Sequence, residues 1–266
     1  MNPGLLDLIL FSEKRKDFLV LLKEGPRNIE ETLEKLQVTR TALLPQIKKL
    51  KEENLVIQEE GVYRLSMIGE IVVEKMQPLL ETLAVFEKNE DFWADRKLTP
   101  IPHHLIKRIN ELGDYRLIEP DLSHTFDLNP EFVKYLSTSN CIHMFLSYFH
   151  PQLPAFFLSL SRKDIEVSLI LSEAVYLRFE EDFRKECEEF LKMKNTSLLI
   201  LEKKDIEIPA LIASTDRIMT LGLFNESNRF DRQYLISLEP GAIKWGEELF
   251  EYYRNMSREI KLELKI

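Results

Sequence analysis

The sequence of 266 residues has little of what several protein classes need. Its two cysteines, Cys141 and Cys187, are too few for a disulfide framework and lack the spacing of metal ligands. Its eight glycines form no glycine-rich phosphate loop, and neither GxSxG nor HExxH occurs. These absences remove the usual signatures of nucleotide binding, serine hydrolysis and zinc proteolysis. We therefore expect no enzyme activity, no catalytic residue, no metal and no cofactor.

Signals for a membrane or for secretion are also lacking. No apolar run reaches about 18 residues, the length that a membrane-spanning helix needs. The first residues show no basic region followed by an apolar core, so no secretory signal is predicted. Scarce cysteine fits a reducing compartment. We expect a cytoplasmic protein with no membrane partner.

The composition is that of an ordinary globular protein, with 44% hydrophobic and 30% charged residues and room for one large or two ordinary domains. Its net charge of −9 is unevenly distributed. Residues 1–66 hold eleven lysines and arginines against eleven aspartates and glutamates, so the acidity belongs to residues 67–266. A near-neutral N-terminal part lacks the basic footprint of many DNA-binding proteins. DNA binding would require clustered positive groups or two copies acting together.

The stretch that begins at Thr39 organises the N-terminal part. Leu43, Ile47 and Leu50 recur at helical spacing and predict a helix with one buried face. Pro45 is tolerated only in the first turn of a helix, which moves the expected start to Leu43 or Leu44.

Two short β-prone runs follow this helix. Residues 55–57 and 62–63 are separated by residues 59–61, Glu-Glu-Gly, which predicts a hairpin. A helix followed directly by a hairpin is typical of a winged helix-turn-helix, in which the helix enters the major groove of DNA and the hairpin lies along the phosphates.

The preceding residues complete the order of elements in that fold. Residues 5–23 predict one helix, or a short helix and a longer one, that ends at Gly25-Pro26. Residues 29–36 predict a second helix, with Asn28 as its N-cap and Glu31 completing a capping box. We therefore assign residues 1–66 to a winged helix-turn-helix domain.

Candidate DNA contacts are the polar residues outside the apolar face of the predicted helix, together with the basic residue of the hairpin. Hydroxyl and basic groups suit phosphates, and arginine, lysine and amide groups suit base edges. The acidic hairpin tip weakens its expected role on phosphates. The alternative is a winged helix that contacts only proteins. The candidates are Thr39, Arg40, Thr41, Gln46, Lys48, Lys49 and Arg64.

Residues 67–102 form the predicted linker. Residues 70–90 carry an apolar stripe typical of a long helix, which we expect to pair with a second copy; packing on its own domain is the alternative. Residues 91–102, DFWADRKLTPIP, form the domain boundary, where Pro100 and Pro102 exclude helix.

Residues 103–266 alternate helical and apolar strand patterns, which predicts a mixed α/β layer domain. We expect this domain to sense a signal or to mediate dimerisation. Dense aromatic residues favour either an apolar pocket or an ordinary core, and Arg217, Thr220 and Asp231 are candidates for contacts with an unidentified small-molecule effector. Expected helices cover residues 103–112, 130–136, 151–160, 173–194 and 241–257, and expected strands cover 116–119, 124–127, 166–171, 197–201, 210–213, 217–224 and 233–238. Residues 140–149 predict either a buried strand or an apolar helix.

The five histidines and two cysteines carry weak signals. His103 and His104 stand at the domain boundary, where they could sense pH, but no metal-ligand spacing accompanies them. Cys141 lies in an apolar run, and the acidic neighbours of Cys187 blunt its reactivity. Neither cysteine favours a redox switch.

Two segments resemble a known family. They are FW…IP…LI.RI.EL, over residues 92–112, and A..WG.ELF.YY, over residues 242–253. Both are similar to archaeal winged-helix regulators that join an ArsR-like head to the domain named for the methanogenesis regulator of filament formation. The resemblance covers essentially the whole chain. It implies a homodimeric transcription factor that binds double-stranded DNA, responds to a metabolic state of methanogenesis and has no catalytic residues.

Overall fold

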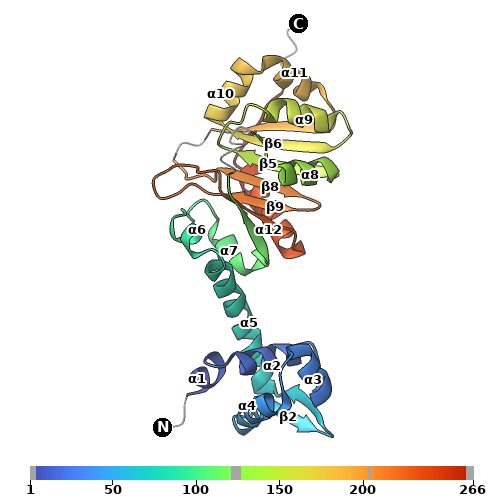
Figure 1. Cartoon of the computed structure of the whole chain (residues 1–266). Coiled ribbons are helices and arrows are strands. Elements are labelled where there is room, and N and C mark those ends of the chain that lie inside the picture. The colour runs from blue at the N-terminus through green and yellow to red at the C-terminus, as the bar shows by residue number, and fades with distance from the viewer. Residues whose placement is uncertain (1–3, 121–126, 203–204, 262–266) are drawn as a thin grey trace. The chain divides into compact units, whose positions relative to one another are not determined.

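The structure is a computed structural model that describes residues 4–120, 127–202 and 205–261. The chain forms two compact units, residues 1–81 (unit 1) and 82–266 (unit 2), and the division falls within the predicted linker. Figure 1 shows helices and strands mixed in both units, which confirms the predicted mixed α/β class.

Unit 1 surrounds a small hydrophobic core with helices and a three-stranded antiparallel sheet of order β1-β3-β2. The last helix continues into unit 2. The elements are α1 (Leu5–Leu10), α2 (Glu13–Lys23), β1 (Arg27–Asn28), α3 (Ile29–Leu36), α4 (Arg40–Glu52), β2 (Val56–Glu59), β3 (Val62–Leu65) and α5 (Met67–Glu87).

Local signals determine α3 and the hairpin. The predicted capping box is confirmed: Asn28 Oδ1 accepts from the Glu31 amide at 2.9 Å, and the Glu31 carboxylate accepts from the Asn28 amide at 3.4 Å. Strands β2 and β3 pair as predicted, with Glu60 and Gly61 in the turn at φ 48° and 83°. Positive φ at both central residues is typical of a two-residue hairpin turn.

Helix α4 begins at Arg40, so the expected start at Leu43 or Leu44 is wrong. The Thr39 carbonyl accepts hydrogen bonds from the Ala42 and Leu43 amides, both at 3.1 Å, and these bonds open the helix before the proline. Pro45 therefore lies within the helix, where it has no amide hydrogen for the carbonyl four residues earlier.

The start of helix α5 packs closely against the residues that precede the hairpin. Ser66 Oγ accepts from the Gly69 amide at 3.0 Å and donates to the Asn54 carbonyl at 2.5 Å. A Cβ at position 69 would lie 2.1 Å from the Leu55 carbonyl oxygen, so only glycine allows this approach.

A buried arginine joins α1, α2 and α4. The Arg15 side chain, 9% exposed, donates from Nε to the Leu8 carbonyl and from Nη1 to Gln46 Oε1 at 2.5 Å. No carboxylate within ion-pair distance of Arg15 occurs among the described residues. The two neutral acceptors therefore satisfy part of a buried charged group that would otherwise lack partners.

Unit 2 is built on one mixed sheet of order β11-β7-β6-β5-β8-β9-β10-β4. Strands β5, β6 and β7 run parallel, and the other pairings are antiparallel. The strands are β4 (Tyr115–Ile118), β5 (Cys141–Leu146), β6 (Glu166–Ser172), β7 (Thr196–Leu201), β8 (Leu211–Thr215), β9 (Met219–Gly222), β10 (Tyr234–Ser237) and β11 (Arg258–Glu259).

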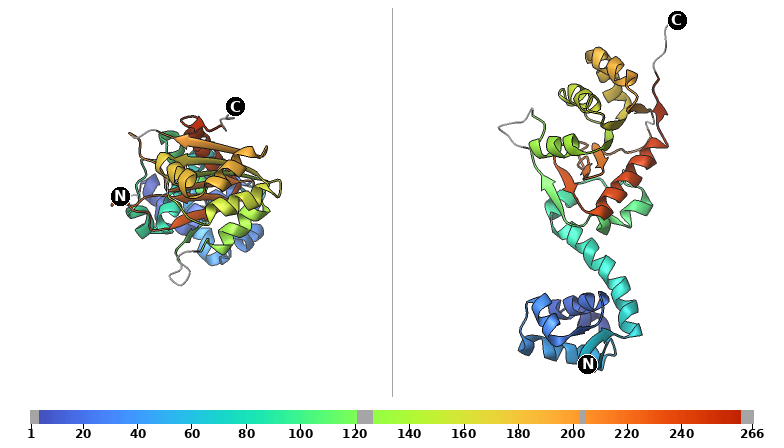
Figure 2. Two further views of the ribbon diagram at one scale, coloured as in Figure 1. Left: turned by 90° about the horizontal axis from the view of Figure 1, so that it is seen from above. Right: turned by 90° about the vertical axis from the view of Figure 1, so that its right-hand side faces the viewer.

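Helices cover both faces of this sheet (Figures 1 and 2). One face packs on α12 and on the segment from α6 to η1, and the other packs on α8 to α11, so each face has its own core. The helices are α6 (Glu90–Ala94), α7 (His103–Ile106), η1 (Ile109–Leu112, a 3-10 helix), α8 (Pro130–Thr138), α9 (Leu153–Ser161), α10 (Glu173–Asp182), α11 (Arg184–Lys192) and α12 (Pro240–Arg254).

The boundary segment is anchored by aromatic side chains. Trp93 Nε1 donates to the Val85 carbonyl at 2.9 Å, and Tyr115 Oη donates to the same carbonyl at 2.7 Å. On α12, Trp245 donates to the Leu105 carbonyl at 2.9 Å. These bonds hold the residues around α6 and α7 against the sheet of unit 2.

Two predicted elements of unit 2 are divided. The single helix expected over residues 103–112 is a short α7 followed by η1, and the single helix expected over residues 173–194 breaks between α10 and α11. The second break lies at Phe183, whose backbone is not helical (φ −130°, ψ 40°) and whose ring centroid lies 5.5 Å from that of Phe149. Most of the strand expected over residues 124–127 lies outside the described residues.

The Arg15 contact generates a stability prediction. Gln46→Ala removes an acceptor from the buried guanidinium, so we expect the free energy of unfolding of unit 1 to fall by about 1–3 kcal/mol. Lys49→Ala, an exposed change on the same helix, is the matched control and should stay within about 0.5 kcal/mol of the wild type. Urea unfolding measures both; equal stability of the two variants would contradict a structural role for Gln46.

Candidate nucleic-acid interface

The outward face of α4 carries a row of polar and basic side chains. Arg40, Thr41, Leu44 and Lys48 are exposed, and Leu44 is 38% exposed although it is apolar. The opposite face holds Leu43, Ile47 and Leu50, which are at most 2% exposed. The helix therefore has one buried face and one face open to a partner, as its spacing predicted.

The first turn of α4 leaves donors available. The Thr39 and Thr41 hydroxyl oxygens lie 3.2 Å apart, and the Thr39 side chain makes no capping bond to the helix. The amides of Arg40 and Thr41 therefore keep the positive end of the helix dipole open. Two hydroxyls and two amides at one helix start form a set of donors that suits a phosphate group.

Three candidate basic residues are paired with exposed carboxylates. Arg40 contacts Glu30 at 2.5 Å, Lys48 contacts Glu52 at 3.8 Å, and Arg64 contacts Glu59 at 2.9 Å. Exposed ion pairs are worth about 0–1 kcal/mol. A polyanion can therefore replace the carboxylates at little cost in free energy.

Gln46 and Lys49 do not belong to the row. Gln46 is half-buried and bound to Arg15, because it follows Leu43 by three residues and precedes Leu50 by four. Lys49 is exposed at the side of the row. Lys51, which the sequence analysis missed, lies beside Arg40 on the helical wheel, and its ammonium contacts Gln58 of β2 at 2.7 Å.

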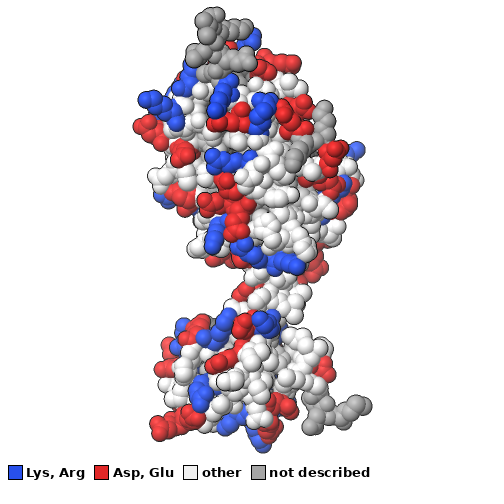
Figure 3. Space-filling model, turned by 180° about the vertical axis from the view of Figure 1, so that it is seen from behind, with Lys and Arg blue, Asp and Glu red and all other residues white. Residues whose placement is uncertain are grey.

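Charges on unit 1 are mixed. On the face shown in Figure 3, basic and acidic side chains alternate over this unit without a broad area of one sign. The hairpin adds Glu59 and Glu60 next to Arg64. The face shown in Figure 3 therefore offers no broad basic surface to a polyanion.

The three effector candidates do not lie together. Arg217 is exposed at the turn between β8 and β9. Thr220 is fully buried in β9, and its hydroxyl has no hydrogen-bond partner within the described part of the chain. Asp231 accepts from the buried Arg96 side chain at 2.5 Å. The structure thus separates residues that the sequence grouped.

A cavity of about 260 Å³ lies elsewhere in unit 2, at the sheet edge where β4 and β5 end and β8 and β10 begin. Tyr148 and Phe230 line it, with ring centroids 4.7 Å apart. Phe145 and Phe157 instead fill the cores of the two sheet faces.

The cysteines and histidines have structural surroundings. Burial raises the pKa of the Cys187 thiol to about 11, and burial also raises the pKa of Cys141. His143 stacks on Phe250 with centroids 5.0 Å apart, whereas His103 and His104 are exposed. Within the described ranges, no group of three His, Cys, Asp or Glu side chains is arranged for a metal ion.

Helices of the described residues also lack the combination of length and hydrophobicity that crossing a bilayer requires.

Comparison with known proteins follows the two units. Residues 6–84 match the N-terminal domain of methanogenesis regulatory protein FilR1, and residues 125–256 match its middle domain. The chain is 25% identical over 254 residues to methanogenesis regulatory protein FilR1 of Methanothrix harundinacea (strain 6Ac). The alignment covers 94% of this chain and 56% of that protein, so the chain spans about half the length of this curated relative.

Two solved structures share weaker similarity. TrmBL2, described as an archaeal chromatin protein with a novel mode of DNA binding, has 11% identity and a TM-score of 0.44, with 93% of each chain covered. Nuc, a phospholipase D family member from Salmonella typhimurium, has 12% identity and a TM-score of 0.41, covering 56% of this chain and all of Nuc. Both TM-scores are too low to establish a shared fold.

The domain matches involve both units and agree with the resemblance in the sequence. The two FilR1 domain matches and the FilR1 relative support the assignment of this chain to the methanogenesis regulatory protein family.

Proposed function

We propose that the chain is a sequence-specific DNA-binding transcriptional regulator, with unit 1 as an ArsR-like winged helix and no catalytic activity. The observation that carries the proposal is the outward row on α4, Arg40, Thr41, Leu44 and Lys48, followed directly by a hairpin. In this proposal α4 enters the major groove and β2–β3 form the wing. Such a regulator would act in the cytoplasm, on the genome.

The chemistry of the row suits a DNA groove. Arg40 can bind a guanine edge through two hydrogen bonds, Leu44 can contact a thymine methyl group, and Lys48 can neutralise a phosphate. The hydroxyls of Thr39 and Thr41 lie at the helix start, where phosphate oxygens are favoured. The release of counterions from DNA would offset the loss of the exposed ion pairs.

The proposal includes a homodimer formed through α1 and α5. Met67, Ile68, Ile71 and Leu79 are 50–78% exposed along one side of α5. Leu6 and Phe11, on and just after α1, are 69% and 82% exposed, while α1 buries Leu8 and Ile9 in the same core that α5 helps to close. A second copy of this apolar surface is its natural cover in a two-fold arrangement.

Dimerisation would also offset the lack of net positive charge in the proposed DNA-binding residues 1–66. Residues 1–66, with equal numbers of basic and acidic residues, would bind one site weakly, but two linked copies bind with a much higher combined affinity. Two α4 helices would then meet half-sites about one helical turn, or a multiple of it, apart.

One observation favours a rival function. The acidic hairpin tip, Glu59 and Glu60, repels phosphates and would suit a basic protein partner, so the head could act in a non-catalytic interaction scaffold. A DNA-binding measurement separates the two functions.

DNA binding depends on the row in a testable way. Arg40→Ala with Lys48→Ala should weaken binding at least tenfold to a genomic fragment whose gel mobility the wild-type protein shifts. It should also lower the slope of log affinity against log salt concentration by about 1 for each copy, because Lys48 is the phosphate contact. Lys107→Ala with Lys134→Ala removes the same charge from exposed positions of unit 2 and should change neither quantity. Fluorescence anisotropy titrations at several salt concentrations measure both. Equal losses in the two double variants would contradict the assignment of the row.

The dimer has its own test. Ile71→Glu places a charge within the apolar side of α5 and should convert a dimer to a monomer in sedimentation velocity. Leu177→Glu, an equivalent change at a 48% exposed leucine of α10, is the matched control and should remain dimeric. A monomeric wild-type protein, or a dimeric Ile71→Glu variant, would rule out this interface.

A further inference from the structure

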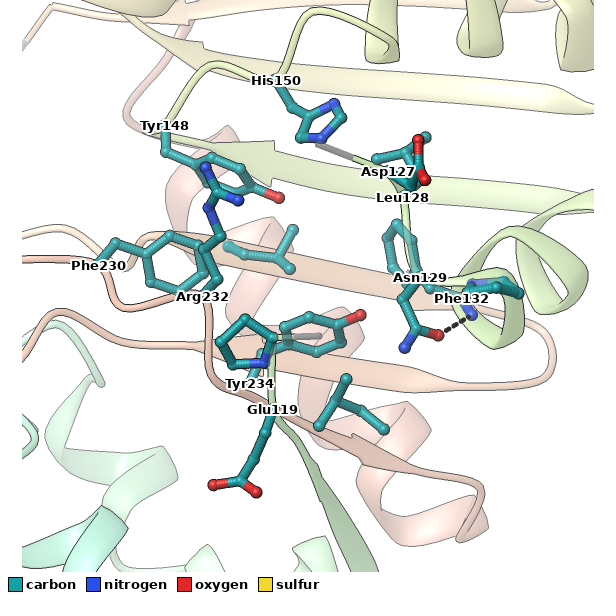
Figure 4. A pocket seen from close by; sticks show the side chains of 14 residues that line it. Glu119, Asp127, Leu128, Asn129, Phe132, Tyr148, His150, Phe230, Arg232 and Tyr234 are labelled. Atoms are coloured by element: carbon teal, nitrogen blue, oxygen red, sulfur yellow. Dashed lines mark hydrogen bonds between the residues drawn. The ribbon is translucent and has the colours of Figure 1, made fainter. Parts of the chain in front are cut away.

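The cavity of unit 2 combines apolar walls with hydrogen-bond donors on one side. Figure 4 shows Tyr148, His150 and Arg232 on one side and Phe132 and Asn129 on the other. Its volume of about 260 Å³ is close to the lower end of the range for small-molecule sites, about 300 Å³. The cavity is therefore large enough for a small organic molecule.

The donor side is positive or neutral. Burial raises the pKa of Tyr148 to about 12, so its hydroxyl keeps its proton at neutral pH. His150 Nδ1 accepts from the Gln152 amide at 3.3 Å, which leaves the proton of the neutral imidazole on Nε2. Burial and the Arg232 charge lower the pKa of His150, so the neutral form prevails at pH 7.

The two carboxylates at the cavity have partners of their own. Glu119 accepts from Gln233 Nε2 at 3.1 Å, and Figure 4 shows its carboxylate directed away from the aromatic rings. Asp127 accepts from Gln152 Nε2 at 3.4 Å. Each carboxylate thus accepts a hydrogen bond from a neutral side-chain amide of the protein, and the Arg232 guanidinium lies on the donor side of the cavity.

Residues 230–234 alternate between two environments. Phe230, Arg232 and Tyr234 line the cavity, whereas Asp231 and Gln233 both accept from Arg96 Nη2 at 2.5 Å. Arg96 is 4% exposed and lies two residues after the end of α6. A buried arginine thus fixes, from behind, the backbone that presents Arg232 and Tyr234 to the cavity.

Arg232 itself has a strained backbone, with φ 66°. A non-glycine residue at positive φ is uncommon and costs of the order of RT or more, and such residues cluster at ligand-binding positions. The Arg96 contacts on both sides of Arg232 hold this conformation.

We propose that this cavity binds a small organic anion whose carboxylate or similar oxyanion head contacts Arg232, Tyr148 and His150, and whose apolar body packs against Phe132, Phe230 and Leu211. Asn129 contributes its Nδ2 amide group, because its Oδ1 already accepts from the Glu131 and Phe132 amides. Occupancy acts on residues 230–234 and, through Arg96, on α6. The site gives the proposed regulator a signal input but does not depend on DNA binding.

Calorimetric titration of the full chain tests the site with two probes of equal size. Phenylacetate carries the predicted carboxylate, and 2-phenylethanol replaces that carboxylate with a neutral alcohol. We expect phenylacetate to bind at millimolar concentration or below, and 2-phenylethanol to bind at least tenfold more weakly, because only the carboxylate forms charge-assisted hydrogen bonds.

Two variants locate the binding. Arg232→Gln should weaken phenylacetate binding at least tenfold, and Arg229→Gln, an exposed arginine outside the cavity, is the matched control and should bind like the wild type. Tyr148→Phe removes only a hydroxyl and should weaken phenylacetate binding several-fold. It provides a second test of the site if the Arg232→Gln variant does not fold. Equal affinity for the two probes, unchanged affinity in the folded Arg232→Gln or Tyr148→Phe variant, or no binding of phenylacetate would overturn the proposal.

The titration contains no DNA, so its outcome is independent of the proposed function. Phenylacetate binding by a protein that ignores DNA would support the site and remove the regulator. DNA binding without any response to phenylacetate would do the reverse.

Discussion

The burial of three apolar side chains on α4 determines what the other side of that helix can do. Leu43, Ile47 and Leu50 lie in the core of unit 1 with residues of α1, α2, the hairpin and α5. Each contributes roughly 1.5–3 kcal/mol when fully buried. Rotation of α4 about its axis would expose these side chains, so the row that begins at Arg40 is held outward. The candidate interface is thus a consequence of the core.

Buried arginines refine this arrangement in each unit. Arg15 joins α1 and α2 to α4 through the Leu8 carbonyl and Gln46. Arg96 joins the residues after α6 to the segment that enters β10. Its buried Nε and Nη1 have no hydrogen-bond partner among the residues that the structure describes, although Nη1 lies 3.6 Å from Asp95 Oδ2. Each arginine fixes the backbone beside a candidate binding surface, and a buried charge tolerates little displacement because lost partners are costly.

Short sequence motifs correctly predict the elements that are determined by residues close together in the sequence. Asn28 and Glu31 predict α3 because a capping box needs only four residues, and Gly61 predicts the hairpin because a tight turn needs positive φ. Helix α4 starts earlier than Pro45 predicts, because the Thr39 carbonyl accepts hydrogen bonds that form the first turn before the proline. Phe183, at the break between α10 and α11, has its ring against Phe149, a contact between residues distant in sequence that periodicity cannot reveal.

The candidate sites divide in the same way. The outward positions of Arg40, Thr41 and Lys48 follow from helical spacing, and that spacing also placed Gln46 beside the buried leucines, a signal that the sequence analysis passed over. The cavity could not be predicted, because it assembles the ends of four strands whose order is set by long-range pairing. Asp231 was one residue away from the cavity side chain Arg232, and strand alternation turned it toward Arg96.

The contact between the outer face of α4 and DNA is tested most directly by crosslinking. Photoreactive benzoylphenylalanine can replace Leu44, at the centre of the row. On irradiation it should crosslink to a genomic DNA fragment whose gel mobility the protein shifts. The same group in place of Leu177 should form no crosslink. If the Leu44 derivative still retards the fragment but forms no crosslink to DNA, α4 does not face the DNA and the account fails.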